Sequence, residues 1–289
     1  MPGTAGPDRP RSPCRNGKGR GVTHTAVFRG SAVCPSPVVD PSLRLFLFHH
    51  AGGSHLLYRD WAPEFPPDWE LCLLNAPGRA HRRDQPAVDR VEDLVDHFHQ
   101  ELLPQLDRPF AFFGHSMGGL TAYELTLRLA AQGGPMPVWL GLSAFGPPRG
   151  AEYRRRPGRH ESSDAELRDW LRSIGGTPAE LLDNDDVWQL FEPVFRSDFK
   201  LVDTWARDPA TGSPPLPFAV FGGEQDLVVE PRRLKAWADH SPHVQGVHLY
   251  PGGHFYLHDH RADLIRTVTA SVRAARAAAE RIITAPGAS

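Results

Sequence analysis

The sequence predicts an α/β fold, in which a mostly parallel sheet is covered by helices on both faces. From Leu43 onward, short apolar runs alternate with segments whose apolar residues recur every three or four positions. Each short run is apolar at successive positions, which is typical of strands that are buried on both sides. A third observation is that residues 150–215 contain helical patterns and no strand-like run. They therefore predict a helical insertion between two strands of the sheet.

The short apolar runs place the strands, and the periodic segments place the helices. The predicted strands are Leu43–His49, Trp69–Asn75, Phe110–Gly114, Val138–Leu142, Phe218–Gly222 and Val247–Tyr250. The predicted helices of the main domain are Val88–Leu106, Leu120–Gln132, Glu230–His240 and Arg261–Ile283. Their alternation along the chain favours parallel pairing, because parallel strands need helical crossover connections.

Within the insertion, helical spacing predicts helices at Ser163–Ile174 and Asp186–Arg207. The second helix carries a wide apolar stripe that includes Phe195, Phe199 and Trp205. One interpretation is that this stripe packs onto the main domain. We also expect the insertion to lie over the carboxyl edge of the sheet, where it would act as a lid on an active site.

Residues 1–41 differ in composition from the rest of the chain. They are rich in Pro, Gly, Ser and Arg and lack a sustained apolar period, so they predict a disordered N-terminal extension. They contain no apolar segment of the kind that a secretory signal needs. We expect one domain over residues 42–284, with the lid at residues 150–215, and a flexible tail over residues 285–289.

Composition argues against several classes of function. The net charge of −2 gives no reason to expect nucleic acid or an anionic membrane as a partner. No run approaches the roughly 18 apolar residues of a membrane span. Cys14, Cys34 and Cys72 have no metal-type spacing, and the apolar run around Cys72 predicts a buried free thiol. We expect a cytoplasmic monomer with neither a metal nor an organic cofactor.

The segment from Phe110 to Gly119 contains the most informative motif in the chain. An apolar run of strand character ends in Gly-x-Ser-x-Gly around Ser116, and a helical pattern follows at once. This order is that of a nucleophile elbow, a sharp turn between strand and helix that exposes the serine at the sheet edge. Gly114 and Gly118 are expected where a side chain would collide with the turn. Ser116 is therefore the predicted nucleophile.

A serine hydroxyl needs a base within hydrogen-bond reach, and the base needs an acid that orients it. Asp226 follows the apolar run Phe218–Gly222 and is the predicted acid, with Glu224 as its local rival. His254 follows the next apolar run and a pair of glycines, and it is the predicted base. Three nearby histidines are weaker candidates, because they lie within the strand or in the expected following helix: His248, His258 and His260.

An oxyanion hole requires two backbone N–H groups aimed at the developing charge. The first is expected from Met117, because it begins the helix after the serine and the first N–H groups of a helix have no intrahelical partner. The second should come from the loop after an early strand. His49–Gly53 is that loop, and Ala51 is the residue whose N–H is expected to point inward. A plain glycine turn is the alternative interpretation.

Together these motifs resemble the type II thioesterases, the stand-alone α/β-hydrolases that accompany modular polyketide and nonribosomal peptide synthases. The resemblance extends from Leu43 to Leu264, and a Gly-Gly-Thr-Pro sequence within the helical insertion is its most specific part. One departure is His49, where the family usually has proline; we expect an effect on the rigidity of the loop and not on its donors. The segments that carry the resemblance are His50–Gly53 with Tyr58 and Trp61, Pro77–Arg79, Gly114–Gly118, Gly175–Pro178, Asp198–Phe199 with Trp205, Gly222–Asp226 and Pro251–Phe255.

The resemblance implies an α/β-hydrolase fold and an editing activity, in which aberrant acyl groups are hydrolysed from the phosphopantetheine arm of acyl or peptidyl carrier proteins. Ser116 would attack the thioester carbonyl with His254 as base, and Asp226 would fix the imidazole. The N–H groups of Ala51 and Met117 would hold the oxyanion. A serine carboxylesterase or an acyltransferase acting on a small-molecule secondary metabolite would carry the same triad and is the alternative. A catalytically silent binding module is the third interpretation.

Three arginines lie close together after the second predicted strand. Arg79, Arg82 and Arg83 are interpreted as part of a solvated charged loop. Contact between these side chains and an acidic carrier-protein surface is the alternative.

Overall fold

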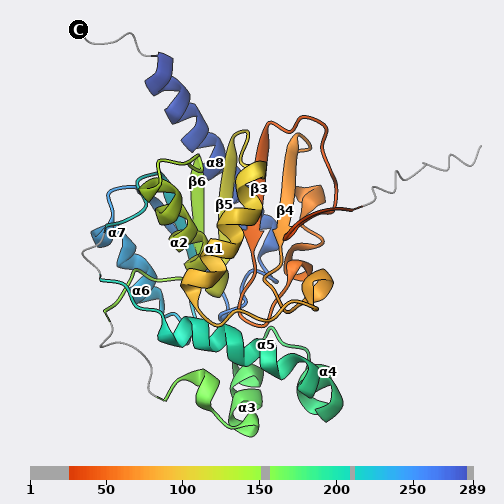
Figure 1. The fold of residues 1–289 in the computed structure, drawn as a ribbon. Coiled ribbons are helices and arrows are strands. Elements are labelled where there is room, and N and C mark those ends of the chain that lie inside the picture. Colours follow the sequence, from red (N-terminus) through yellow and green to blue (C-terminus); the bar gives the residue numbers. More distant parts are fainter. Residues whose placement is uncertain (1–25, 151–156, 209–211, 285–289) are drawn as a thin grey trace, which may run out of the picture.

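The computed structural model describes residues 26–150, 157–208 and 212–284 of the chain (Figure 1). Its centre is a sheet of eight strands in the order β1-β2-β4-β3-β5-β6-β7-β8. Every neighbouring pair from β4 to β8 is parallel, which confirms the mostly parallel sheet that the sequence predicts. The parallel strands are β3 (Leu43–Phe48), β4 (Trp69–Leu74), β5 (Phe110–His115), β6 (Trp139–Ser143), β7 (Phe218–Gly223) and β8 (Val244–Tyr250).

A short antiparallel hairpin extends one edge of this sheet. It consists of β1 (Val27–Arg29) and β2 (Ala32–Cys34), and β2 pairs with β4. The prediction that residues 1–41 are disordered is therefore wrong for this hairpin. Strands of three residues are too short to show a periodicity, and it is the complete burial of β2 against the sheet that stabilises them. Residues 1–25 and the expected tail at residues 285–289 lie outside the described residues.

Helices cover both faces of the sheet (Figure 1). One face is covered by α1 (Val91–Leu102), α2 (Met117–Ala131), α6 (Pro231–Lys235) and α7 (Trp237–His240), and the other by α8 (Arg261–Thr284). Among the described helices, none combines the length and the apolarity needed to cross a membrane. The short 3-10 helices are η1 (His55–Tyr58), η2 (Ala62–Glu64), η3 (Ala80–Arg82), η4 (Leu103–Gln105) and η6 (Arg159–Glu161).

The strands contribute side chains to two separate hydrophobic cores, because successive side chains of a strand point to opposite faces of the sheet. In β5, Phe112 belongs to the core beneath α1 and α2, whereas Phe113 belongs to the core beneath α8. From α8, Leu264, Val268 and Val272 recur every four residues and are fully buried or nearly so. This is why the strands are apolar at successive positions.

Three helices differ in extent from the sequence prediction. α1 ends at Leu102, where Pro104 in the following turn cannot donate a helical hydrogen bond. α2 begins at Met117, directly after the serine, three residues earlier than predicted. The predicted helix Glu230–His240 is two short helices that meet at Ala236.

The helical insertion contains α3 (Asp164–Ile174), α4 (Ala179–Asp183) and α5 (Asp185–Thr204). We refer to residues 157–208 as the lid; Figure 1 shows α5 lying across one end of the sheet, with α3 and α4 beyond it. α5 begins where the side chain of Asn184 accepts hydrogen bonds from the first N–H groups of the helix. α3 and α5 correspond to the two predicted helices, and α4 was not predicted.

The apolar stripe of α5 packs within the lid and onto the main domain at once. Phe195 and Phe199 join α3 in a small core of the lid, and Ala51 from the loop after β3 packs against this core. A side chain at Gly52 would come within 2.0 Å of the ring of Phe195. The lid therefore rests directly on the loop that the sequence assigns to the oxyanion hole.

Candidate active site

Ser116 sits in a strained turn between β5 and α2. Its φ of 56° and ψ of −116° lie outside the regions that L-residues ordinarily adopt. The turn is possible because the flanking residues are glycines: a Cβ on Gly114 would lie 2.0 Å from the carbonyl oxygen of Gly118, and one on Gly118 would lie 2.2 Å from that of Phe48. The N–H of Ser116 donates to the carbonyl of Ser143 at 2.8 Å, which anchors the turn to β6.

Ser116, His254 and Asp226 form a continuous hydrogen-bonded chain. Nε2 of His254 lies 3.0 Å from Oγ of Ser116, and Nδ1 lies 2.8 Å from Oδ2 of Asp226. The other carboxylate oxygen of Asp226 accepts from the N–H groups of Val228 and Val229 at 2.8 and 3.0 Å. Because Nδ1 faces a buried carboxylate, it carries the proton, which leaves the lone pair of Nε2 directed at the serine hydroxyl.

The alternative candidates for the acid and the base lie outside this hydrogen-bonded chain. Glu224 is exposed, and its N–H is used in a bond to the carbonyl of Tyr250. His248 lies within β8 and stacks on Phe221, with ring centroids 5.2 Å apart. His258 and His260 were expected in the following helix, but they lie in the turn that precedes α8.

The two predicted oxyanion donors come from the start of α2 and from the loop after β3. Met117 is the first residue of α2, so its N–H has no partner within the helix. Ala51 lies in a tight loop that is closed by a bond from the N–H of Gly53 to the carbonyl of His50, at 3.0 Å. Nδ1 of His50 donates a hydrogen bond to the carbonyl oxygen of Ala51 at 2.8 Å, which further fixes the loop.

His49, the departure from the family pattern, stabilises this loop. Its Nε2 accepts from the N–H of Ala76 at 3.2 Å, so its Nδ1 carries the proton and donates to the carbonyl of His50 at 2.7 Å. Burial, together with the positive charge of Arg79, holds the pKa of His49 well below its ordinary value. A neutral imidazole with one fixed tautomer therefore ties the loop to the end of β4.

A buried ion pair, which the sequence analysis missed, connects the lid to the same loop. Nη1 and Nη2 of Arg79 lie 2.6 and 2.7 Å from the two carboxylate oxygens of Asp198 on α5. Oδ2 of Asp198 also accepts from the N–H of Gly52 at 2.7 Å, and Arg79 donates to the carbonyl of Gly53 at 3.2 Å. Both residues stand in motifs that carry the family resemblance, which was the available signal.

The interpretation of Arg79, Arg82 and Arg83 as a solvated loop is wrong for the first two. Arg82 is also buried and pairs with Glu101 at 3.0 Å. Arg83 alone is exposed, and its nearest carboxylate is the exposed Asp84. Buried guanidinium groups require paired carboxylates, and only the tertiary structure supplies them.

Two cavities meet at Ser116 beneath the lid. The larger, of about 280 Å³, is lined by apolar side chains such as Phe145 and Trp205 and by three charged residues, Arg149, Asp203 and Arg233. The smaller, of about 130 Å³, lies between His254 and the lid residue Trp170. Val202 of α5 borders both cavities. A substrate whose reacting carbonyl lies at Ser116 can therefore extend in two directions.

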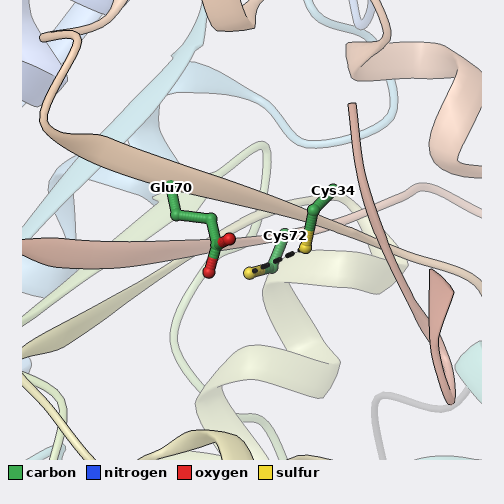
Figure 2. A group of neighbouring side chains, drawn as sticks. All are labelled: Cys34, Glu70 and Cys72. Atoms are coloured by element: carbon green, nitrogen blue, oxygen red, sulfur yellow. Dashed lines mark hydrogen bonds between the residues drawn. The ribbon is translucent and has the colours of Figure 1, made fainter. Parts of the chain in front are cut away.

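Among the described residues, a group of side chains of the kinds that bind metal ions lies outside this site. Cys34, Glu70 and Cys72 bring their ligand atoms within 4.8 Å of one another (Figure 2). The sequence analysis expected no metal from the cysteine spacing. Oε2 of Glu70 already accepts from Arg29 at 2.7 Å and from Arg44 at 2.9 Å. Two guanidinium groups beside the carboxylate oppose a further cation.

Comparison with known proteins shows the family of this chain. The model of the thioesterase domain family matches residues 43–272. The chain belongs to the thioesterase family. It is an enzyme of the α/β-hydrolase fold that hydrolyses thioesters, as the sequence analysis predicted.

This thioesterase has relatives in antibiotic biosynthesis. It is 33% identical over 229 residues to a probable cadicidin biosynthesis thioesterase of Streptomyces griseus, covering 78% of this chain and 61% of that one. It is 32% identical over 258 residues to linear gramicidin dehydrogenase LgrE of Brevibacillus parabrevis, covering 87% and 95%. LgrE is named for a dehydrogenase reaction, whereas the matched family is that of thioesterases. Among solved structures, it is similar to the type II thioesterase BorB from the borrelidin biosynthetic cluster, with a TM-score of 0.70, 28% identity, and coverage of 82% and 95%.

Proposed function

We propose that this thioesterase hydrolyses acyl groups from the phosphopantetheine arm of acyl or peptidyl carrier proteins, and so removes aberrant intermediates from a polyketide or nonribosomal peptide synthase. The observation that carries the proposal is the chain of hydrogen bonds from Ser116 through His254 to Asp226, placed where two cavities meet under the lid. The similarity to BorB, a type II thioesterase, supports the substrate class.

The proposed reaction begins with acyl transfer to the enzyme. His254 takes the proton of Ser116 while Oγ attacks the thioester carbonyl, and the N–H groups of Ala51 and Met117 stabilise the oxyanion. Collapse of the tetrahedral intermediate breaks the carbon–sulfur bond, and the imidazolium returns its proton to the departing pantetheine sulfur. Asp226 stays ionised and stabilises the imidazolium.

Hydrolysis then releases the acyl group. His254 takes a proton from water, and the resulting hydroxide attacks the acyl-Ser116 carbonyl within the same oxyanion hole. The carbon–oxygen bond to the serine breaks, Oγ recovers the proton from His254, and a free carboxylic acid leaves.

The two cavities offer separate places for the arm and for the acyl group of an arm-borne substrate. A pantetheine arm is thin and extended, so it can reach Ser116 along one cavity while the acyl group occupies the other. We assign the acyl group to the larger cavity, because its volume of about 280 Å³ leaves more room for a chain than the 130 Å³ of the other cavity. The smaller cavity would then take the arm, and the larger cavity would select by the size of the acyl group.

The test is mass spectrometry of an acetyl- or propionyl-loaded acyl carrier protein after incubation with the wild type or with Ser116→Ala. Loss of the acyl mass with the wild type alone supports the proposal. Ser173→Ala is the control, because Ser173 is an exposed serine near the end of α3. Turnover by Ser116→Ala at the wild-type rate would overturn the mechanism.

The alternative functions give different results in the same assay. A carboxylesterase would leave the carrier acylated, cleave a matched oxygen ester faster than the thioester, and still be labelled at Ser116 by a fluorophosphonate. An acyltransferase would move the acyl group onto an added alcohol or amine in preference to water. A silent binding module would show neither turnover nor labelling.

A further inference from the structure

Cys34 and Cys72 lie side by side on β2 and β4, far from the proposed catalytic residues in the sequence (Figure 2). Their sulfur atoms are 3.7 Å apart. Both side chains are fully buried, and both thiols are free. A sulfur–sulfur bond of about 2.05 Å would need only a small further approach.

The strand register allows that approach. The N–H of Asn75 donates to the carbonyl of Ser31 at 2.9 Å, and the last matched pair of β2 and β4 is Val33 with Leu73. Continuing the antiparallel register by one residue places Cys34 opposite Cys72. Hydrogen-bonded and non-hydrogen-bonded pairs alternate along such a ladder, so this pair is of the non-hydrogen-bonded type, in which Cα atoms approach to about 4.5 Å. That spacing lies within the range of about 4.4–6.8 Å that a disulfide spans.

The groups around the pair shift the pKa values of the two thiols in opposite directions. The hydrogen bond from Cys72 lowers the pKa of Cys34, helped by the charges of Arg29 and Arg44 and opposed by burial and Glu70. The same hydrogen bond and burial raise the pKa of Cys72 well above its ordinary value. Nη1 of Arg29 lies 3.8 Å from the sulfur of Cys34. Cys34 is therefore the more acidic thiol of the pair, and it is the one that reacts as a thiolate once it has lost its proton.

We propose that Cys34 and Cys72 are a reversible thiol–disulfide pair that hydrogen peroxide oxidises. The Cys34 thiolate attacks one peroxide oxygen, which gives a Cys34 sulfenic acid and hydroxide. Hydroxide removes the proton of Cys72, and the new thiolate attacks the sulfur of Cys34 and expels hydroxide. Counted from two thiols, one peroxide is reduced to two water molecules and one disulfide forms. A dithiol reverses the oxidation by exchange.

The disulfide would link β2 to β4 near the edge of the sheet. β1 is only three residues long, and Phe28 at its centre is 58% exposed, so peroxide reaches the buried pair when this hairpin opens. Once formed, the bond joins β2 to β4 covalently and restricts further opening. Oxidation therefore raises the melting temperature of the protein, and reduction returns it to its starting value.

The test uses full-length protein in which Cys14, the third cysteine, is replaced (Cys14→Ser), so that only the pair remains. The protein is treated with hydrogen peroxide, quenched with catalase, denatured and alkylated with N-ethylmaleimide. We expect a mass loss of about 2 Da, for the two hydrogens removed, and no maleimide adduct. Dithiothreitol before alkylation should restore two adducts and the original melting temperature.

Single replacements in the same background show the order of the steps. In Cys72→Ala, dimedone should trap a sulfenic acid at Cys34, whereas in Cys34→Ala no dimedone adduct should form at Cys72. The proposal would be overturned if the peroxide-treated protein still took up two maleimide adducts. Methionine sulfoxide elsewhere in the same sample would show that the oxidant had acted. Stoichiometric zinc that survives purification and protects both thiols would also overturn it, in favour of a metal site that includes Glu70.

Discussion

Arg79 and Asp198 form a buried ion pair that joins the lid to the loop after β3. The pair uses both nitrogens of the guanidinium fork and both carboxylate oxygens, and each partner also binds the backbone of Gly52 or Gly53. The position of α5 and the conformation of the loop that holds Ala51 are therefore coupled through this ion pair, in addition to the apolar contacts of the lid with Ala51 and Gly52. The lid is therefore attached to the loop that is predicted to supply one oxyanion donor.

Asp198→Asn should destabilise the protein and impair turnover together. The substitution leaves the buried charge of Arg79 uncompensated, which typically costs about 3–5 kcal/mol in the free energy of unfolding. Urea denaturation measures that loss, and kcat/KM on an acyl carrier protein measures the effect on the loop. The control is Asp84→Asn, because Asp84 pairs with Arg83 at the surface. Equal stability of Asp198→Asn and Asp84→Asn would show that the ion pair does not hold the lid.

Asp226→Asn should lower kcat strongly with little change in structure. An amide in place of the carboxylate no longer fixes the tautomer of His254, and the equivalent change in a reference serine triad lowers kcat about 10⁴-fold. Glu224→Gln, two positions earlier and exposed, is the matched control and should keep the wild-type rate. If Glu224→Gln is the slower variant, the acid has been assigned to the wrong residue.

Val202→Trp should narrow the range of acyl groups that are hydrolysed. Val202 borders both cavities, and a tryptophan there would fill space beside Ser116. We expect kcat/KM to fall more for long acyl chains than for acetyl, measured over a series of loaded carrier proteins. Leu190→Trp is the control, because Leu190 lies on the same helix and is 76% exposed. If kcat/KM falls by the same factor for every acyl chain length, the cavity beside Val202 does not hold the acyl group.

Stability should fall as the pH drops from about 6.5 toward 4. Burial lowers the pKa of His50 to about 4, and it holds the pKa of His49 and His115 well below the ordinary value. In the unfolded chain these groups titrate near 6.5, so below that pH the unfolded state binds more protons and is favoured. Each such histidine contributes a slope of up to about 1.4 kcal/mol per pH unit. Urea denaturation at several pH values should show a shallower slope for His50→Gln, and an unchanged slope would contradict the assignment.

The parts of the proposed site that the sequence predicts are those with a local physical cause. The turn at Ser116 needs Gly114 and Gly118 because their positions leave no room for a Cβ, and that need is visible in five consecutive residues. Asp226 and His254 each follow an apolar strand and a glycine turn, and parallel strands bring such positions to the same edge of the sheet. The structure brings these three side chains together as predicted, and their catalytic roles stay proposals.

The remaining features depend on partners that are distant in the chain and carry no periodic signal. Arg79 and Asp198 meet across 119 positions, and neither residue type alone distinguishes a buried ion pair from a solvated charge. The β1–β2 hairpin is too short to be recognised before β4 provides its pairing edge.

By itself, the sequence determined the alternation of strands and helices, the elbow at Ser116 and the thioesterase family. These follow from backbone sterics and hydrophobic periodicity, which act over a few neighbouring residues. Only the tertiary structure decided that Asp198 binds Arg79, that His49 braces the loop after β3, and that Cys34 faces Cys72. Such contacts are set by strand register and by the docking of the lid, because burial forces polar and ionisable groups to find partners wherever the fold has placed them.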